Sequence, residues 1–164
     1  ELIIQHKKLS MLCNSSVNTL RIMTFVENSK SEILFCGLRV GNGYNSVDNF
    51  HKGGMGILVD INTGKLKGNA IDKDLNVYKK HPVTKTLFNN YQLPFWKETK
   101  ELVLKSSLTN QNIKVVGWDV AITKDGPVLV EGNRRPGFDL VQVLYDRGRK
   151  DIIKKVLKEI NNKK

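Results

Sequence analysis

With 164 residues, of which 40% are hydrophobic and 26% are charged, the chain suits one folded domain and is too apolar for intrinsic disorder. Its 27 lysine and arginine residues outnumber 16 aspartate and glutamate residues, and the net charge of +11 favours anionic partners, although several lysine pairs suit a solvated surface. No apolar run approaches the ~18 residues that cross a bilayer, and the two cysteines lack CxxC or disulfide spacing, so we expect a cytoplasmic protein without a transmembrane segment.

The first half of the chain has the pattern of strands joined by turns. Apolar residues alternate over 20–26, and a polar turn separates them from a second apolar run over 33–40, which predicts a hairpin with a buried Cys36. A loop with five glycines follows over 41–56. Runs over 57–61 and 66–71 flank Asn62-Thr63-Gly64 and predict a second hairpin. His81, which precedes a proline, is assigned a structural role.

Helices are predicted towards the end of the chain. Pro94 suits the first position of a helix over 95–108, and Asp151 is placed to cap a last helix. The apolar residues of that last helix recur with a helical period: Ile153, Val156, Leu157 and Ile160. Together these elements predict an α+β fold, an antiparallel sheet with flanking helices, in a single domain over residues 1–164.

The segment 114–137 predicts two strands around Asp125-Gly126 and allows two registers. A two-residue loop would put Asp119 and Glu131 on opposite faces of the sheet. A three-residue loop over 124–126, with Gly126 left-handed, places these two carboxylates directly opposite each other. A slip of one residue inverts every side chain, so burial of a continuous apolar face favours the second register. That face holds Val116, Trp118, Val120, Ile122, Val128 and Val130.

The other face of this hairpin gathers oxygen donors. In the favoured register, Asp119 and Glu131 have Cβ atoms about 5 Å apart, and like charges at this distance destabilise a sheet unless a cation lies between them. Asn133 follows on the same face, one pleat further on. Oxygen donors without nitrogen or sulfur suit Mg²⁺, which shares its coordination shell with phosphates. The alternative is a surface hairpin whose polar face meets water.

Several motifs in order resemble a known family. The run 130–137 (Val-Glu-Gly-Asn-Arg-Arg-Pro-Gly), downstream of Gly117-Trp118-Asp119, resembles the closing motif of ATP-grasp enzymes, where an acidic residue and a Glu-x-Asn hold the metals of Mg-ATP. The run 49–54 (Asn-Phe-His-Lys-Gly-Gly) is similar to their Asn-x-His-basic-Gly-Gly loop. With the segments 16–21, 81–84 and 93–96, the pattern is most similar to sugar-transfer-associated ATP-grasp proteins, over roughly residues 1–149.

The resemblance implies the C-terminal lobe of a larger ATP-grasp protein, with ATP and two Mg²⁺ ions between this lobe and a preceding N-terminal lobe. It implies that Glu131 bridges the two ions while Asp119 and Asn133 each complete one. It also implies that Arg21 and Arg39 steady the γ-phosphate and an acyl intermediate. The alternative is that Arg21 is an ordinary strand residue, that Arg39 is an ordinary residue at a loop edge, and that the glycine loop is a hairpin tip. The nucleotide-binding residues that the resemblance implies are Glu1, Asn49, His51, Lys52, Gly53 and Gly54.

The implied function is an ATP-dependent ligase that activates a carboxylate substrate as an acylphosphate, which an amine or similar nucleophile then attacks. The resemblance ties this reaction to polysaccharide or cell-surface sugar biosynthesis. The alternative is a non-catalytic module that binds acidic glycan or nucleic acid through its positive charge. We do not expect nucleic acid as a partner, because the aromatic residues lie within apolar patterns rather than among basic residues.

Overall fold

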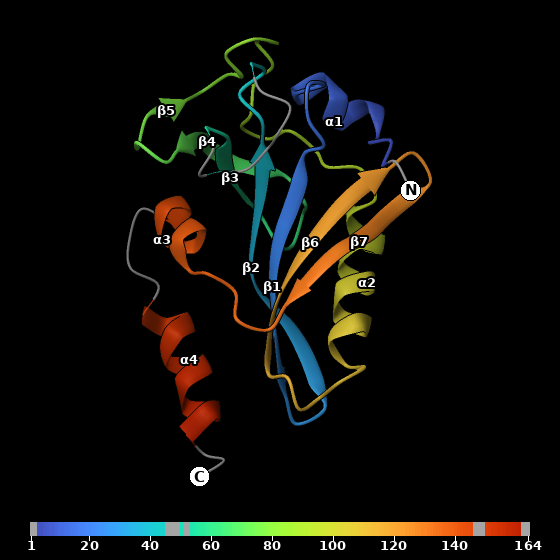
Figure 1. The fold of residues 1–164 in the computed structure, drawn as a ribbon, viewed down its shortest axis with the longest axis vertical. Helices are drawn as coiled ribbons and strands as arrows, with labels where there is room; N and C mark the ends of the chain where they lie inside the picture. Colours follow the sequence, from blue (N-terminus) through green and yellow to red (C-terminus); the bar gives the residue numbers. More distant parts are fainter. Residues whose placement is uncertain (1–2, 45–49, 51–52, 146–149, 162–164) are drawn as a thin grey trace.

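The computed structural model describes residues 3–44, 50, 53–145 and 150–161, which form an antiparallel sheet with helices on both faces (Figure 1). Within these residues the sheet has seven strands in the order β5-β4-β3-β2-β1-β6-β7. The strands are β1 (Thr19–Glu27), β2 (Lys30–Val40), β3 (Met55–Val59), β4 (Leu66–Asp72), β5 (Val77–Tyr78), β6 (Val115–Thr123) and β7 (Gly126–Asn133). The helices are α1 (Lys7–Leu12), α2 (Trp96–Ser107), α3 (Asp139–Tyr145) and α4 (Lys150–Asn161). The predicted α+β fold is confirmed.

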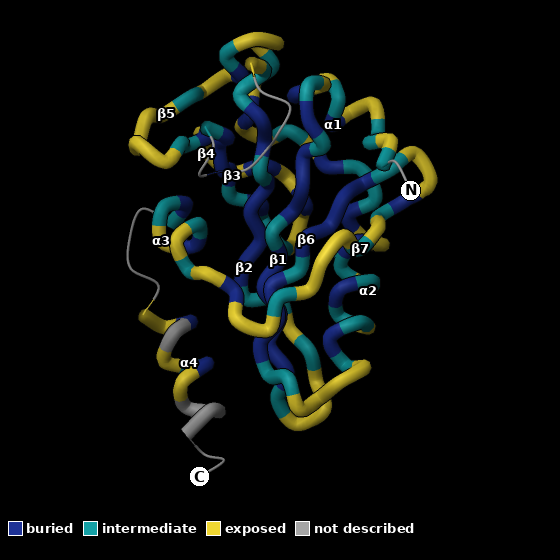
Figure 2. Tube along the Cα trace, in the orientation of Figure 1, coloured by how far each residue is buried: buried dark blue, intermediate teal, exposed yellow. Residues whose placement is uncertain are grey.

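Strands β1 and β2 form the predicted hairpin at the centre of the sheet. Glu27 pairs with Lys30 at the turn, and the pairing continues to Thr19 and Arg39 at the far end. The middle of each strand is buried (Figure 2), because both faces of the sheet are covered there. Cys36 is fully buried, as predicted. In the strand order of the sheet, β1 has a hydrogen-bonded neighbour on each side, β2 and β6.

Strands β3 and β4 form the second predicted hairpin. Asp60 organises its turn, because Oδ1 accepts hydrogen bonds from the backbone N–H groups of Asn62 (3.1 Å) and Thr63 (2.9 Å). Gly64 has a φ of 72° and lies against α2, since a Cβ atom here would come within 2.2 Å of Trp96 Cγ. The turn is thereby packed onto the start of α2.

Helices α1 and α2 cover one face of the sheet. Phe95 precedes α2 in a left-handed conformation with φ 51°, so Pro94 lies before the helix and not at its first position as predicted. Helix α1 has six residues and was not predicted, because so short a helix shows little periodicity. The core on this face consists of Leu9, Leu12, Cys13, Leu20, Ile22, Cys36, Leu38, Val40, Met55, Ile57, Val59, Leu66, Ala70, Phe88, Leu93, Trp96, Val103, Val120 and Ile122.

Helices α3 and α4 pack against part of the other face of the sheet (Figure 1). Glycines in the strands allow α3 to approach closely: a Cβ atom on Gly56 would come within 2.6 Å of Leu140 Cδ1, and one on Gly37 within 2.9 Å of Leu144 Cδ1. The core on this face consists of Met23, Phe25, Phe35, Val115, Val141, Leu144, Ile152 and Val156.

Helix α4 differs in detail from the prediction. It begins at Lys150, so Asp151 lies in its first turn rather than at its cap. Ile152 and Val156 are buried, whereas Leu157 is 49% exposed, so the buried stripe does not follow the predicted positions. The predicted side chains at positions 153 and 160 lie outside the described side chains. Within the described residues, no helix has both the length and the apolar composition that a membrane span requires.

The β6–β7 hairpin turns through two residues rather than the predicted three. Thr123 pairs with Gly126, which leaves residues 124 and 125 in the turn. Gly126 has a φ of 131°, and the Thr123 hydroxyl donates to its carbonyl oxygen at 2.9 Å. If this pairing continued unchanged, Asp119 would face Val130, and Glu131 would point to the other side of the sheet.

A β-bulge in β7 changes that register. The pairing shifts by one residue between Asp119 and Val120, and Val130 is the additional residue. Leu129 pairs with Val120 and packs against the core. Val128 and Val130 are 43% and 48% exposed, and β7 is the most exposed of the long strands (Figure 2). The predicted burial of these two valines is wrong, because the bulge and the shorter turn place Leu129 over the core instead.

Candidate functional site

Two carboxylates face each other across the last hairpin. Asp119 in β6 and Glu131 in β7 are direct cross-strand partners, so the predicted opposition is confirmed. Asp119 is 7% exposed, whereas Glu131 is exposed at the edge of the sheet. Asn133 pairs with Gly117 and lies on the same face, two residues beyond Glu131. Three oxygen-bearing side chains therefore share one face of the hairpin.

Two arginines from the neighbouring strands contact the buried carboxylate. Arg21 in β1 is the direct cross-strand partner of Asp119. Its Nη2 donates to Asp119 Oδ2 at 3.2 Å, and its Nε lies 2.7 Å from Oδ1. Arg39 in β2 donates from Nη2 to the same Oδ2 at 2.9 Å. The side chain of Arg21 is 18% exposed, that of Arg39 17% and that of Asp119 9%. This ion cluster is therefore largely shielded from solvent.

Thr19 orients one of these arginines. Thr19 and Arg39 are direct partners across β1 and β2, and Thr19 Oγ1 accepts hydrogen bonds from Arg39 Nε (3.0 Å) and Nη2 (2.6 Å). Sequence reasoning did not select Thr19 as a site residue. The available signal was its spacing, because Thr19 lies two residues before Arg21 and so shares its face of β1.

The donor set on this face fits a small, hard cation. Asp119 Oδ1 and Arg21 Nε are buried, and neither completes a hydrogen bond although the atoms are close, which means that their geometry is misaligned. Glu131 makes no hydrogen bond or ion pair with another described residue. Within the described part of the chain no three His, Cys, Asp or Glu side chains gather, and the third oxygen-bearing side chain on this face is the Asn133 amide. An oxygen-only set of this kind suits Mg²⁺.

The structure describes three residues of the predicted nucleotide-binding loop over 49–54: Phe50, Gly53 and Gly54. Four of the predicted nucleotide-binding residues lie outside the described residues: Glu1, Asn49, His51 and Lys52. Gly54 is buried, and Gly53 has a φ of 92°, a conformation that favours glycine. Both precede β3, where Gly56 pairs directly with Arg39. The loop therefore leads directly into β3, the strand that pairs with the Arg39 end of β2.

His81 contacts Gly41, the first residue of the glycine-containing loop over 41–56. It is fully buried, and Nδ1 accepts hydrogen bonds from the backbone N–H groups of Val83 and Thr84, both at 3.2 Å. Nε2 therefore carries the proton and donates to the Gly41 carbonyl oxygen at 2.9 Å. Because both ring nitrogens are used to hold backbone groups, this geometry supports the structural role predicted for His81.

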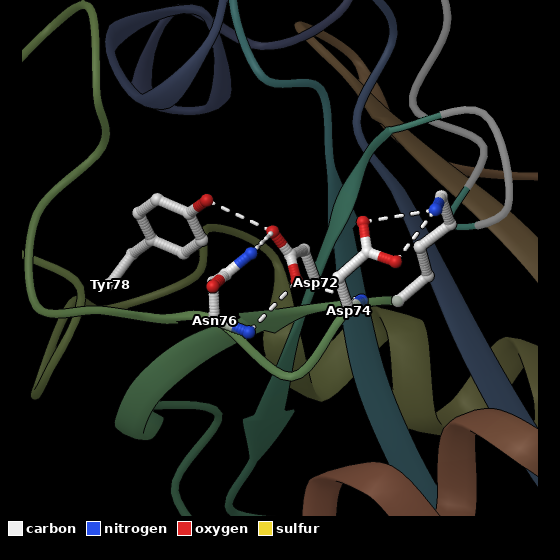
Figure 3. A network of polar contacts seen from close by, with 5 residues as sticks. Asp72, Asp74, Asn76 and Tyr78 are labelled. Atoms are coloured by element: carbon white, nitrogen blue, oxygen red, sulfur yellow. Dashed lines mark hydrogen bonds and ion pairs between the residues drawn. The ribbon is translucent and has the colours of Figure 1, made fainter.

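A separate polar network closes the β4–β5 turn (Figure 3). Asp72 accepts hydrogen bonds from the backbone N–H groups of Asp74 and Asn76, from the Asn76 side chain and from the Tyr78 hydroxyl, at 2.9–3.0 Å. Burial raises the pKa of Asp72, but these hydrogen bonds outweigh that effect and hold the pKa below its ordinary value. Lys73 pairs with Asp74. Both oxygens of Asp72 are used within the turn, so we assign the network a structural role.

The α+β fold of the described residues, with its seven-stranded antiparallel sheet, is consistent with an ATP-grasp protein, and comparison with known proteins agrees. A family model described as sugar-transfer associated ATP-grasp matches residues 1–159. The chain belongs to this family. A search of curated proteins gave no significant match.

Family membership supports a coarse function directly. ATP-grasp proteins bind ATP, generally with Mg²⁺, so the chain is a nucleotide-binding protein of an ATP-dependent enzyme family associated with sugar transfer. The oxygen donors described above are consistent with the metal.

Proposed function

We propose that this chain carries the metal-binding half of an ATP-dependent ligase that joins a carboxylate to an amine or a similar nucleophile. The observation that carries the proposal is the convergence of Arg21, Arg39, Asp119 and Glu131 from four adjacent strands onto one face of the sheet. Such a mixture of permanently charged cations and opposed carboxylates suits a substrate that is itself a polyanion carrying metal ions.

In the proposal, the acidic face holds the metal ions of Mg-ATP. Glu131, exposed and directly opposite Asp119, would hold the Mg²⁺ ions together with Asp119 and Asn133. Bound Mg²⁺ supplies neutralisation of the charge on the β- and γ-phosphate oxygens. The exposure of Glu131 supports this role, because its carboxylate is accessible without rearrangement of the core.

The two arginines hold the transferring phosphate in the same proposal. A guanidinium group stays charged at all relevant pH values and presents paired N–H groups in one plane, which matches phosphoryl and acyl oxygens. Arg21 and Arg39 lie on either side of Asp119 Oδ2, so both donate into the same small region. The proposal extends to Gly53 and Gly54, whose backbone N–H groups would contact the nucleotide, and to Glu1, Asn49, His51 and Lys52 as further nucleotide contacts.

The proposed reaction has two steps. A carboxylate oxygen of the substrate attacks the γ-phosphorus of ATP, so that a new P–O bond forms while the bond to ADP breaks. The nucleophile then bonds to the acyl carbon, phosphate leaves with its C–O bond electrons, and the nucleophile loses its proton to solvent. The side chains of the site orient the reactants and stabilise charge rather than forming covalent bonds to them.

The sugar-transfer association of the family supports a substrate in polysaccharide or cell-surface sugar biosynthesis, and we propose that the reaction takes place in the cytoplasm. We also propose that residues 1–164 form one domain that acts as a C-terminal lobe. An N-terminal ATP-grasp lobe would then cover the open face that carries Glu131.

The proposal is tested by Mg²⁺-dependent protection from thermal unfolding. With a non-hydrolysable ATP analogue at about 100 times its Kd, protection of about 2.7 kcal/mol is expected, and EDTA should remove it. Glu131→Gln, which keeps the size of the side chain, should lose the protection. Glu101→Gln on α2 is the matched control, because Glu101 is also exposed but lies on the far side of the sheet.

Two outcomes contradict the proposal. Equal protection with and without Mg²⁺, combined with stronger protection by an acidic polysaccharide, would favour the non-catalytic anion-binding module. Full protection of Glu131→Gln would show that the opposed carboxylates do not hold the metal.

A further inference from the structure

One arginine of the ion cluster covers the oxygen that a metal ion would need. Asp119 Oδ1 is buried, and the nearest cation is Arg21 Nε at 2.7 Å, in a geometry that makes no hydrogen bond. The other oxygen, Oδ2, accepts from both arginines. A cation can therefore reach Oδ1 only after the Arg21 side chain moves.

The two arginines are not held equally. Arg39 donates twice to Thr19 Oγ1 as well as to Asp119. Arg21 is held among the described residues by Asp119 alone. Thr19 thus makes Arg39 the fixed member of the pair and leaves Arg21 as the member that can leave the carboxylate at lower cost.

The charges of the cluster also favour a metal ion that arrives together with an anion. Arg21, Arg39, Asp119 and Glu131 together carry no net charge, so a bare divalent cation gains little attraction there. A metal ion that arrives with a polyphosphate brings its own negative charge, which offers Arg21 a new partner when Asp119 turns to the metal.

We infer that Arg21 is a latch on Asp119, opened by a phosphate anion, so that metal and nucleotide bind cooperatively and neither binds well alone. Thr19 is a positioning residue in this arrangement, because it keeps Arg39 in place while Arg21 moves. The inference rests on the proposed function, since it concerns the order in which the ligands of that same site bind.

The test is the affinity of the nucleotide-free chain for Mn²⁺, measured by electron paramagnetic resonance of the free ion. Arg21→Gln should raise this affinity about tenfold, because Oδ1 is released. Arg39→Gln removes the same charge beside the same carboxylate but leaves Oδ1 covered, so the increase should be much smaller. Lys97→Gln on α2 controls for net charge and should behave like the original chain.

A second measurement in the same variants determines how strongly binding of Mg²⁺ and binding of the ATP analogue are coupled. In the original chain, Mg²⁺ should strengthen binding of the ATP analogue by at least tenfold, and Arg21→Gln should reduce that factor. Equal Mn²⁺ affinities of Arg21→Gln and Arg39→Gln, or no gain in Arg21→Gln, would overturn the latch. If the original chain still shows Mg²⁺-dependent protection, the proposed function stands; if that protection is absent too, the function itself fails.

Discussion

Pro136 lies directly over Gly117, so closely that a Cβ atom on Gly117 would come within 2.6 Å of Pro136 Cβ and 3.6 Å of Arg21 Nη1. The segment that follows β7 therefore folds back across β6, beside the ion cluster. Only glycine leaves room for this crossing.

Gly117→Ala should consequently destabilise the protein and disturb Arg21. Overpacking of this kind costs about 1–3 kcal/mol of unfolding free energy, which urea unfolding measures. Gly137→Ala is the matched control on the same segment, since its added Cβ would meet only Asp139 Oδ2 at an ordinary 3.7 Å. Equal stability of the two variants would contradict the assigned contact.

Glu131→Ala should abolish Mg-ATP-dependent turnover without unfolding the protein. The side chain is exposed and has no partner among the described residues, so the unfolding free energy should change by no more than about 0.5 kcal/mol. Circular dichroism and urea unfolding check the fold, while phosphate release checks turnover in the whole protein. Retained turnover, or gross unfolding, argues against Glu131 as a metal ligand.

Thr24 accepts a hydrogen bond from the indole N–H of Trp118 at 2.8 Å, and Thr24 itself is fully buried. Thr24→Val should leave that N–H without a partner and lower the unfolding free energy by about 1–3 kcal/mol. Thr24→Ser keeps the hydroxyl and should lose less. The reverse order of stability in chemical unfolding would show that packing, and not the hydrogen bond, dominates at this position.

Asp60 should contribute to the acid sensitivity of the protein. Hydrogen bonds from the Thr63 backbone and side chain, with a further one from the Asn62 backbone, outweigh burial and hold the pKa of Asp60 below its usual 3.8. A depressed pKa means that the unfolded chain binds the proton more readily, so this stabilisation is present above pH 3.8 and is lost as the pH falls through the folded pKa. Asp60→Asn should flatten the pH dependence of the unfolding free energy below pH 4. An unchanged slope in acid unfolding contradicts this.

The opposition of Asp119 and Glu131 was predictable, but its mechanism was not. Burial of an apolar face was expected to select the register, and this reasoning predicted the opposition correctly although two of the side chains that it buried, Val128 and Val130, are exposed. It could not locate the bulge at Val130, because on an edge strand an exposed valine costs little and the hydrophobic pattern does not mark the additional residue. The turn was therefore one residue shorter than predicted, and the bulge made up the difference.

The contact of Arg21 and Arg39 with Asp119 required the order of the strands. Neighbouring elements in sequence predict hairpins, and the two in the first half of the chain were correct. The pairing of β1 with β6 joins segments far apart in the chain, and no local pattern specifies it. Short helices such as α1 and α3 were missed for a related reason: six or seven residues give too few turns to establish a period.

The placement of β1 between β2 and β6 has a consequence for how the protein matures. Arg21 and Asp119 are separated by 98 positions, so their contact closes a long loop and must await the synthesis of most of the chain. Until β6 docks, the edge of β1 that faces away from β2 has no strand beside it, and Arg21 lacks its contact with Asp119. A nascent or truncated polypeptide that ends before β6 therefore lacks Asp119, and the ion cluster can form only once the sheet is complete.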